Sequence, residues 1–248
     1  MDIIGIIAEY NPFHNGHIYH IKKIKEMYPN SLIILALNGY FLERGEISVM
    51  TKEEKTKIAL DNGVNLVAEI PFIYGSNSAD TFAECSVNIL HALGVQKIIF
   101  GSESNDISLL TKIAQSQLED NFNEILRSEL KKGSNYPTAL SLALNANIST
   151  PNDLLGISYI KTILKNNYNI TPITIKRTND YHDKISNDPI ISASNIREKI
   201  KNNDDISNYT PVKNLVTLNE ELLFDLLKMK ILTDKDLSKY LTVDEGIE

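Results

Sequence analysis

The stretch IIGIIAEYNPFHNGHIYHIKKI, residues 3 to 24, joins two kinds of hydrophobic pattern through a short polar loop. Its first part is an apolar run of strand length, and such unbroken Ile content is typical of a strand covered on both faces. Its last part repeats apolar residues at helical spacing. A strand, a tight loop and a helix in this order predict the opening unit of an α/β protein with a parallel sheet.

The same alternation continues along the chain. Strand-length apolar runs lie at 3–10, 31–39, 66–71, 97–103 and 170–178. Helical patterns lie at 17–28, 51–62, 78–92, 106–132, 136–146, 153–166, 192–201, 217–230 and 234–242. The long helical region between the fourth and fifth strands reads as an insertion on the basic strand–helix unit. We therefore predict an α/β fold with a helical insertion.

The composition of the sequence changes after Asn187, and residues 202–248 are rich in Asn, Asp and Lys. We predict one catalytic domain over 1–201 and a helical C-terminal segment over 202–248. The chain ends abruptly at DEGIE, without a turn signal, which suggests a truncation.

Composition limits the partners. The formal net charge is −7, so the whole-protein field repels nucleic acid and any RNA binding has to be local. The single cysteine, Cys85, has no partner for an internal disulfide and is expected as a core thiol. No apolar run reaches the roughly 18 residues of a membrane span, and the N-terminus lacks signal-peptide features. We expect a cytoplasmic protein without a membrane partner.

The loop after the first strand lies where open α/β sheets bind ligands, outside the carboxyl ends of the strands. The helix that follows offers unpaired backbone N–H groups, which favour an anion such as phosphate. His14 and His17 could both face that anion, Gly16 lets the backbone approach closely, and Pro12 restricts the entry to the loop.

Three other interpretations of this loop stay open. The histidines could be capping or surface residues. His14, His17 and His20 could be metal ligands, although Glu9 is the one suitable neighbour and we predict no metal site. The apolar residues of the loop could serve mainly as core; these are Tyr10, Phe13, Ile18 and Tyr19.

A second candidate lies late in the chain, in IISASNIREKI, residues 190 to 200. Ser192 and Ser194 stand at a predicted helix start, where hydroxyl residues cap the helix, and Arg197 in the first turn offers a fork to phosphate. Alone, this stretch also fits a plain Ser-capped surface helix that carries an Arg.

The two stretches together resemble a known superfamily. Strand, then NPFHNGH, then helix is similar to the HxGH signature of the nucleotidyltransferases, and ISASNIR is similar to their second phosphate motif, with Ala193 in place of one Ser. The resemblance implies a Rossmann-like fold and attack on a nucleotide α-phosphate. Both histidines would stabilise the transition state while the late helix binds the departing phosphates.

Further stretches resemble one family within it, the tRNA(Met) cytidine acetate ligases. They span residues 1 to 201: EYNPFHNGHIYH, NGYFLERGE, AEIPFIYGSNSADTFAE, FGSES, LKKGSNYP, PNDLLGISYI and KRTNDYHD. This family activates acetate with ATP to acetyl-adenylate and acetylates the wobble cytidine of elongator tRNA(Met), giving N4-acetylcytidine. Its members extend beyond this length, with a helical portion that helps grip tRNA.

The resemblance implies a set of site residues. The catalytic residues are His14 and His17. The ATP-binding residues are Ile7, Ala8, Glu9, Tyr10, Asn11, Pro12, Phe13, His14, Asn15, Gly16, His17, Ile18, Tyr19, His20, Gly101, Asn152, Arg177, Ser192, Ser194 and Arg197. The substrates are ATP, with Mg²⁺ bridging its phosphates, acetate and elongator tRNA(Met).

Three of these positions have physical reasons of their own. Gly101 lies at a strand's carboxyl end, where bare backbone can abut a nucleotide or simply turn. Asn152 could read an adenine edge or cap a helix. Arg177 ends the fifth strand and could point a cation at the ligand or into solvent.

Other polar residues are less determined. Arg44, in YFLERGE, could bind the acetate carboxylate or RNA phosphate, or could pair with Glu43 or Glu46. The cluster Asp180, Tyr181 and His182 could position an RNA base or fold its own loop, and we assign it no catalysis. Two other functions share the motifs: a small-molecule adenylyltransferase, and a non-catalytic nucleotide- or RNA-binding module. The oligomeric state does not follow from the sequence.

Overall fold

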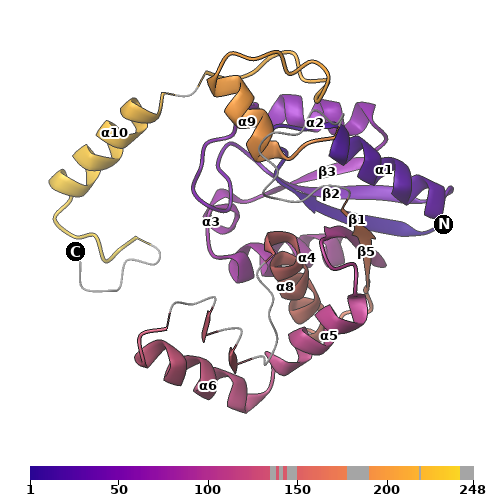
Figure 1. The fold of residues 1–248 in the computed structure, drawn as a ribbon, viewed down its shortest axis with the longest axis vertical. Helices are drawn as coiled ribbons and strands as arrows, with labels where there is room; N and C mark the ends of the chain where they lie inside the picture. Colours follow the sequence, from indigo (N-terminus) through magenta and orange to yellow (C-terminus); the bar gives the residue numbers. More distant parts are fainter. Residues whose placement is uncertain (135–137, 140–141, 144–149, 178–189, 218, 241–248) are drawn as a thin grey trace. The chain divides into compact units, whose positions relative to one another are not determined.

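The structure is a computed structural model that describes residues 1–134, 138–139, 142–143, 150–177, 190–217 and 219–240 (Figure 1). The chain forms two compact units, Met1–Leu215 and Val216–Glu248. The first unit runs past residue 201, where the predicted catalytic domain ends, and that functional boundary remains a prediction.

One five-stranded sheet organises the first unit. Its strands are β1 (Ile3–Ala8), β2 (Leu32–Asn38), β3 (Leu66–Ile70), β4 (Lys97–Ser102) and β5 (Thr171–Lys176). They are ordered β3-β2-β1-β4-β5, and every neighbouring pair is parallel. The chain order reverses between β1 and β4, and a ligand crevice is expected outside the carboxyl ends of those two strands. The predicted α/β fold and all five predicted strands are confirmed.

Helices cover both faces of the sheet. The helices described in the first unit are α1 (Asn15–Met27), α2 (Lys52–Asp61), α3 (Phe72–Gly75), α4 (Ala79–Ala92), α5 (Ile107–Ser116), α6 (Asp120–Lys131), α8 (Pro151–Lys165) and α9 (Ala193–Lys201). Figure 1 shows α1, α2 and α9 on one face of the sheet and α4, α5 and α8 on the other. The helix α1 directly follows β1, and the candidate site lies at the carboxyl end of that strand.

Some predicted helix bounds differ from the observed ones. The pattern at 106–132 divides into α5 and α6, because turn hydrogen bonds at Leu118 and Glu119 end the first helix. The one-turn helix α3 was not predicted, being too short to show a period. The predicted helix at 136–146 falls largely outside the described residues.

The main core lies between the sheet and the helices of the second group. Ile98 and Phe100 of β4 pack with Val87 and Leu90 of α4 and Ile160 of α8. The helix α8 approaches β4 closely at Gly156, where a Cβ would lie 2.3 Å from Cε2 of Phe100. Cys85 is half-buried against this core, and burial raises the pKa of its thiol.

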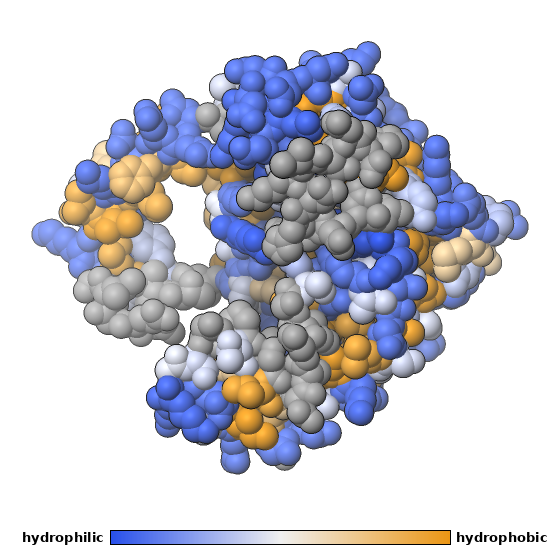
Figure 2. Space-filling view, in the orientation of Figure 1, coloured by the Kyte–Doolittle hydropathy of each residue, from blue (hydrophilic) through white to orange (hydrophobic). Residues whose placement is uncertain are grey.

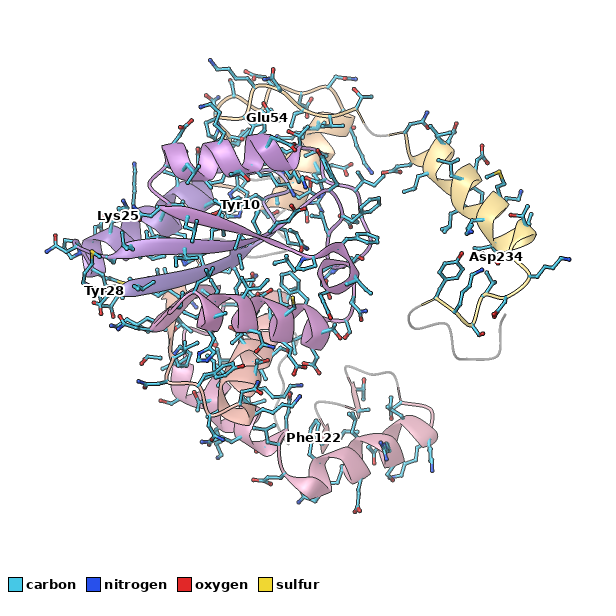
Figure 3. All side chains as sticks on the ribbon, turned by 180° about the vertical axis from the view of Figure 1, so that it is seen from behind. Tyr10, Lys25, Tyr28, Glu54, Phe122 and Asp234 are labelled. Carbon is cyan, nitrogen blue, oxygen red and sulfur yellow. The ribbon has the colours of Figure 1, made fainter. Side chains whose placement is uncertain are left out.

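The second unit contains α10 (Glu220–Thr233), which exposes a row of apolar side chains (Figure 2, orange). The predicted helix at 234–242 is wrong over 234–240. There Asp234, labelled in Figure 3, accepts hydrogen bonds from Lys239 (2.7 Å) and Tyr240 (2.6 Å), and these contacts close a turn instead. Within the described ranges, every helix is too short or too polar to cross a bilayer.

The close approach at Gly156 generates a stability prediction. In Gly156→Ala the new methyl group collides with Phe100, which costs about 1–3 kcal/mol, while alanine recovers up to about 1 kcal/mol of helix propensity. We expect a net loss of about 1–2 kcal/mol in the free energy of urea unfolding. Lys112→Ala, at an exposed position of α5, is the control. A Gly156→Ala variant as stable as the native chain would contradict this packing.

Candidate active site

A cavity of about 310 Å³ opens at the carboxyl ends of β1, β4 and β5. Most predicted site residues line it: Ile7, Ala8, Glu9, Tyr10, Asn11, His14, Gly16, His17, Tyr19, His20, Arg44, Gly101, Asn152, Arg177, Ser192, Ser194 and Arg197. Two motifs that lie about 180 residues apart in the sequence therefore border one cavity. Its place matches the crevice expected from the strand order.

His14 and His17 cap the first turn of α1. The backbone N–H of Gly16 donates to Nδ1 of His14 (3.0 Å), and the backbone N–H of His14 donates to Nδ1 of His17 (3.1 Å). A neutral imidazole has one donor and one acceptor nitrogen. Because Nδ1 accepts in both rings, each neutral ring carries its proton on Nε2. The cap thereby makes Nε2–H the hydrogen-bond donor of both histidines.

Gly16 is required by this arrangement. A Cβ at Gly16 would lie 2.7 Å from Cε1 and 2.9 Å from Nδ1 of His14. The ring centroids of His14 and His17 are 3.8 Å apart. The bare backbone therefore allows the two rings to share the small space at the start of α1. The capping and ligand-binding interpretations of the loop are thus compatible, since the cap uses one nitrogen of each ring.

The surroundings keep these rings uncharged. Burial, with the nearby Arg177 cation, lowers the pKa of His14 to about 3. Burial, His14, His20 and Arg177 together hold the pKa of His17 well below its usual value. Burial and Arg177 lower the pKa of His20 to about 4. At neutral pH all three are therefore neutral donors next to a permanent cation.

The cavity wall contains buried polar atoms that have no hydrogen-bond partner among the described residues. Of the four buried side-chain nitrogen or oxygen atoms that lack a hydrogen bond among the described residues, three belong to residues that line the cavity. They are Nδ2 of Asn11, Nε2 of His20 and Nε of Arg177. A buried polar atom without a partner is costly. A polyanionic ligand rich in acceptor oxygens would satisfy these nitrogens.

Three arginines stand around the cavity, each beside a glutamate. Arg44 faces Glu43 at 3.7 Å, Arg177 faces Glu103 at 3.6 Å, and Arg197 faces Glu46 at 3.5 Å. These distances are longer than a hydrogen bond. Loose ion pairs of this kind keep guanidinium groups near a site that phosphate can enter. Arg44 therefore pairs with Glu43 and also lines the cavity.

Glu103 orients two predicted ATP-binding residues. Nδ2 of Asn152 donates to Oε1 of Glu103 (2.5 Å), and the guanidinium of Arg177 lies beside the same oxygen. The backbone N–H of Asp153 donates to Oε2 of Glu103 (3.2 Å). Asn152 and Arg177 therefore share one carboxylate, which sets their relative position.

Asp153 fastens the start of α8 to the end of β4. Its carboxylate accepts from Oγ of Ser102 (2.5 Å), from Oγ1 of Thr150 (2.9 Å) and from the backbone of Ser104 (3.0 Å). Burial alone would raise the pKa of Asp153, and these hydrogen bonds outweigh burial and hold the pKa below its usual value. The segment that carries Asn152 is thereby held rigidly against the sheet.

A second network anchors the loop after β2. Oε1 of Glu9 accepts from Nδ2 of Asn38 (3.1 Å) and from the backbone N–H of Glu43 (2.7 Å). The fully buried Lys55 donates to the carbonyl oxygens of Asn38 (3.2 Å) and Gly39 (2.7 Å). Burial lowers the pKa of Lys55 to about 8, against the opposing effect of the Glu9 carboxylate. The loop that bears Arg44 is therefore tied to the cavity.

The late motif reaches the first one directly. Nη1 of Arg197 donates to the carbonyl oxygen of Asn11 (2.8 Å). Ser192 caps α9 by accepting from the backbone N–H of Asn195 (3.2 Å), as the capping interpretation predicts. The segment after α9 also returns to the loop, where Thr210 donates to the carbonyl oxygen of Phe13 (2.6 Å) and the backbone N–H of Asn15 donates to that of Tyr209 (2.9 Å).

Four predicted ATP-binding residues do not line the cavity: Pro12, Phe13, Asn15 and Ile18. Phe13 is fully buried, as its core interpretation predicts, and Asn15 contacts the segment 208–209. The cluster Asp180, Tyr181 and His182 lies outside the described residues, as does the end of LKKGSNYP. In the part of the chain that the structure describes, no three His, Cys, Asp or Glu side chains converge to hold a metal ion.

Several residues that line the cavity or orient its lining were not predicted from the sequence. Glu103 and Asp153 stand beside assigned positions in FGSES and PNDLLG, so their motifs were noticed although their roles were not. Tyr159 lines the cavity itself and lies about two helical turns after Asn152 on α8. A pattern of residue types does not show which neighbour of a motif residue orients it.

The chain matches known proteins over its whole length. The family model described as HIGH Nucleotidyl Transferase matches residues 1–248. A tRNA(Met) cytidine acetate ligase of Mycoplasma mobile is 41% identical over 254 residues, covering 99% of this chain and 85% of that protein. One of Caldicellulosiruptor saccharolyticus is 40% identical, covering 100% of this chain and 67% of that protein.

Two solved structures of one protein share the fold of this chain. The crystal structure of Thermotoga maritima TmcAL bound with alpha-thio ATP has a TM-score of 0.76 and 33% identity, over 94% of this chain and 56% of that one. The apo structure of the same protein has a TM-score of 0.77 and 34% identity. The chain thus spans little more than half of that solved chain, 56%.

The parallel sheet, the histidine cap at its switch point and the family match define a nucleotidyltransferase of the HIGH class. Within that class, the chain belongs to the tRNA(Met) cytidine acetate ligase family.

The shared carboxylate generates a prediction about ATP. In Glu103→Gln one charge is lost while the shape is kept, so Asn152 and Arg177 lose their common anchor. We expect KM for ATP to rise about tenfold, equivalent to about 1.4 kcal/mol, in acetate-dependent ATP–pyrophosphate exchange. Glu119→Gln, at an exposed position before α6, is the control. An unchanged KM in Glu103→Gln would show that Glu103 does not orient the predicted ATP-binding residues Asn152 and Arg177.

The lowered pKa of His20 generates a prediction about pH. The pKa of His20 is lowered to about 4, so the unfolded chain binds a proton more readily than the folded chain below about pH 6.5. The stability from this group is fully present above pH 6.5 and falls as the pH drops toward 4. Between pH 7 and pH 4.5, we expect the free energy of urea unfolding to fall by about 2 kcal/mol less in His20→Gln than in the native chain. A His20→Gln variant that loses as much stability as the native chain over this range would contradict the lowered pKa of His20.

Proposed function

We propose that this chain activates acetate with ATP to acetyl-adenylate and transfers the acetyl group to N4 of the wobble cytidine of elongator tRNA(Met). The observation that carries the proposal is the pair of neutral Nε2–H donors, on His14 and His17, in one cavity with Arg177 and Arg197. The names of the relatives supply the acetate and the tRNA.

In the first step, an acetate oxygen attacks the α-phosphorus of ATP. The new bond is that between the acetate oxygen and phosphorus, and the bond from phosphorus to the β-bridging oxygen breaks, releasing pyrophosphate. Negative charge grows on the α-phosphate oxygens, where two preorganised donors are most useful. Neutral rings suit this role, because their donors are oriented by the backbone and do not depend on pH near 7.

The leaving pyrophosphate is expected at the late motif. The first turn of α9 contributes backbone N–H groups beside Ser192 and Ser194, and Arg197 adds a guanidinium held by the carbonyl oxygen of Asn11. ATP would enter as its Mg²⁺ complex, with the ion carried on the phosphates of the substrate. Arg177 and Asn152, on the shared Glu103 carboxylate, would hold the nucleotide itself.

In the second step, N4 of cytidine attacks the acetyl carbonyl carbon. A C–N bond forms, the bond from the carbonyl carbon to the phosphate oxygen breaks, AMP leaves, and N4 gives up one proton to water. A cytidine has to be unpaired and splayed out to reach such a cavity, as RNA loops allow. Because the chain carries a net charge of −7, the RNA contact is local. The reaction belongs in the cytoplasm, where charged substrates of this kind are found.

The test is acetate-dependent ATP–pyrophosphate exchange, with and without tRNA. His17→Ala removes one of two donors, so exchange should fall about 10²- to 10³-fold. His91→Ala is the matched control, since His91 stacks on Tyr168 from α4 and does not line the cavity. Exchange that needs no acetate, or that survives His17→Ala, would overturn the proposal and favour an adenylyltransferase with another acceptor or a binding module.

A further inference from the structure

Exposed aromatic side chains gather at one place on the first unit. Within the described part of Met1–Leu215, the Tyr and Phe side chains with large exposure are Tyr40 (44%), Phe72 (64%) and Tyr74 (44%). All three lie in the segments that directly follow β2 and β3. With Phe41 and Ile73, they form what we call the aromatic patch. Aromatic rings are otherwise buried or half-buried in this part of the chain, so their concentration here is unusual.

Contacts join the two segments into one surface. The rings of Phe41 and Phe72 meet edge to face, with centroids 5.1 Å apart, and so link the loop after β2 to α3. The loop itself is ordered by hydrogen bonds from Leu42 to Glu46 and from Ser48 to Tyr40. The aromatic patch is therefore held in place by contacts within the fold, and α3 lies beside that loop (Figure 1).

The aromatic patch is continuous with the candidate active site. The residues that follow Phe41, namely Leu42, Glu43 and Arg44, line the cavity. Oε1 of Glu9 in the cavity accepts from the backbone N–H of Glu43 (2.7 Å). A molecule that places one group in the cavity would thus extend over the aromatic patch with its neighbouring groups.

The charges around the aromatic patch favour the binding of RNA bases over the binding of phosphate groups. The OH of Tyr40 donates to Glu53 (2.9 Å), and Lys52 is paired with Glu69 (2.8 Å) beside the Tyr40 ring. The local cations are therefore largely matched by carboxylates. A duplex held through its backbone would need a basic surface, whereas unpaired bases bind by stacking on exposed rings.

We propose that the aromatic patch stacks the unpaired bases next to the cytidine that enters the cavity. The partner is a single-stranded RNA loop, and the inference rests on the proposed function, which places an RNA base in the cavity. Phe72 is the central ring, because it is the most exposed and contacts Phe41. Stacking would hold the loop open and present the target base, so these are positioning residues.

The test uses Phe72→Ala and Tyr74→Ala in the full chain, with elongator tRNA(Met) transcript and an anticodon-arm RNA hairpin as probes. Each lost stacking contact should raise KM for the tRNA in acetyl transfer, and Kd for the hairpin, by about 5- to 100-fold. Acetate-dependent ATP–pyrophosphate exchange without RNA should be unchanged. Phe72→Tyr, which keeps a ring, should restore both RNA parameters. Leu109→Ala, an exposed apolar position on α5, is the control.

Four outcomes separate the ideas. Native Kd for the hairpin in Phe72→Ala would overturn the aromatic patch as an RNA surface, whether or not exchange occurs. Equal losses in Phe72→Ala and Phe72→Tyr would also overturn stacking. A fall in thermal stability with RNA binding unchanged would show that protein covers the patch. If the native chain shows no exchange, the proposed function fails, while the hairpin Kd still tests the patch.

Discussion

The backbone amides at the start of α1 need hydrogen-bond acceptors, and His14 and His17 supply them. That requirement determines much of the site. Because Nδ1 of both rings accepts a hydrogen bond, Nε2 of both rings carries the proton and can donate. The cap also requires a glycine at position 16, and it holds the rings at the carboxyl end of β1. Burial then keeps the rings neutral. One capping interaction therefore produces both the shape of the loop and its capacity to bind a developing negative charge.

The rest of the site is brought to this loop by long-range contacts. Arg197 reaches the carbonyl oxygen of Asn11, and the segment 208–210 closes over Phe13 and Asn15. On the other side, Glu103 and Asp153 fix the start of α8 to the end of β4. These networks surround the cavity with arginines whose glutamate partners are too distant for hydrogen bonds, an arrangement that suits a phosphate-rich ligand.

Much of the fold could be predicted because the inner strands β1, β2 and β4 are largely buried, and such strands show as unbroken apolar runs. The partly exposed edge strands β3 and β5 are also rich in apolar residues, so all five strands were found within a few residues of their bounds. The prediction of helices failed where local side chains compete for backbone hydrogen bonds, as at Asp234. It also failed where a helix of one turn is too short to show a hydrophobic period, as in α3. The site residues named from motifs remain predictions about ATP, although most of them do line one cavity.

By itself, the sequence determined the α/β class, the order of strands and helices, the loop with His14 and His17, and the family, because local pattern and motif order carry these features. The tertiary structure alone decided which residues orient the motifs. Glu103, Glu9 and the segment 208–210 act through contacts between chain regions far apart in sequence. It also decided that Tyr40, Phe72 and Tyr74 share one exposed surface beside the cavity, since only the pairing of β2 with β3 brings the segments that follow them together.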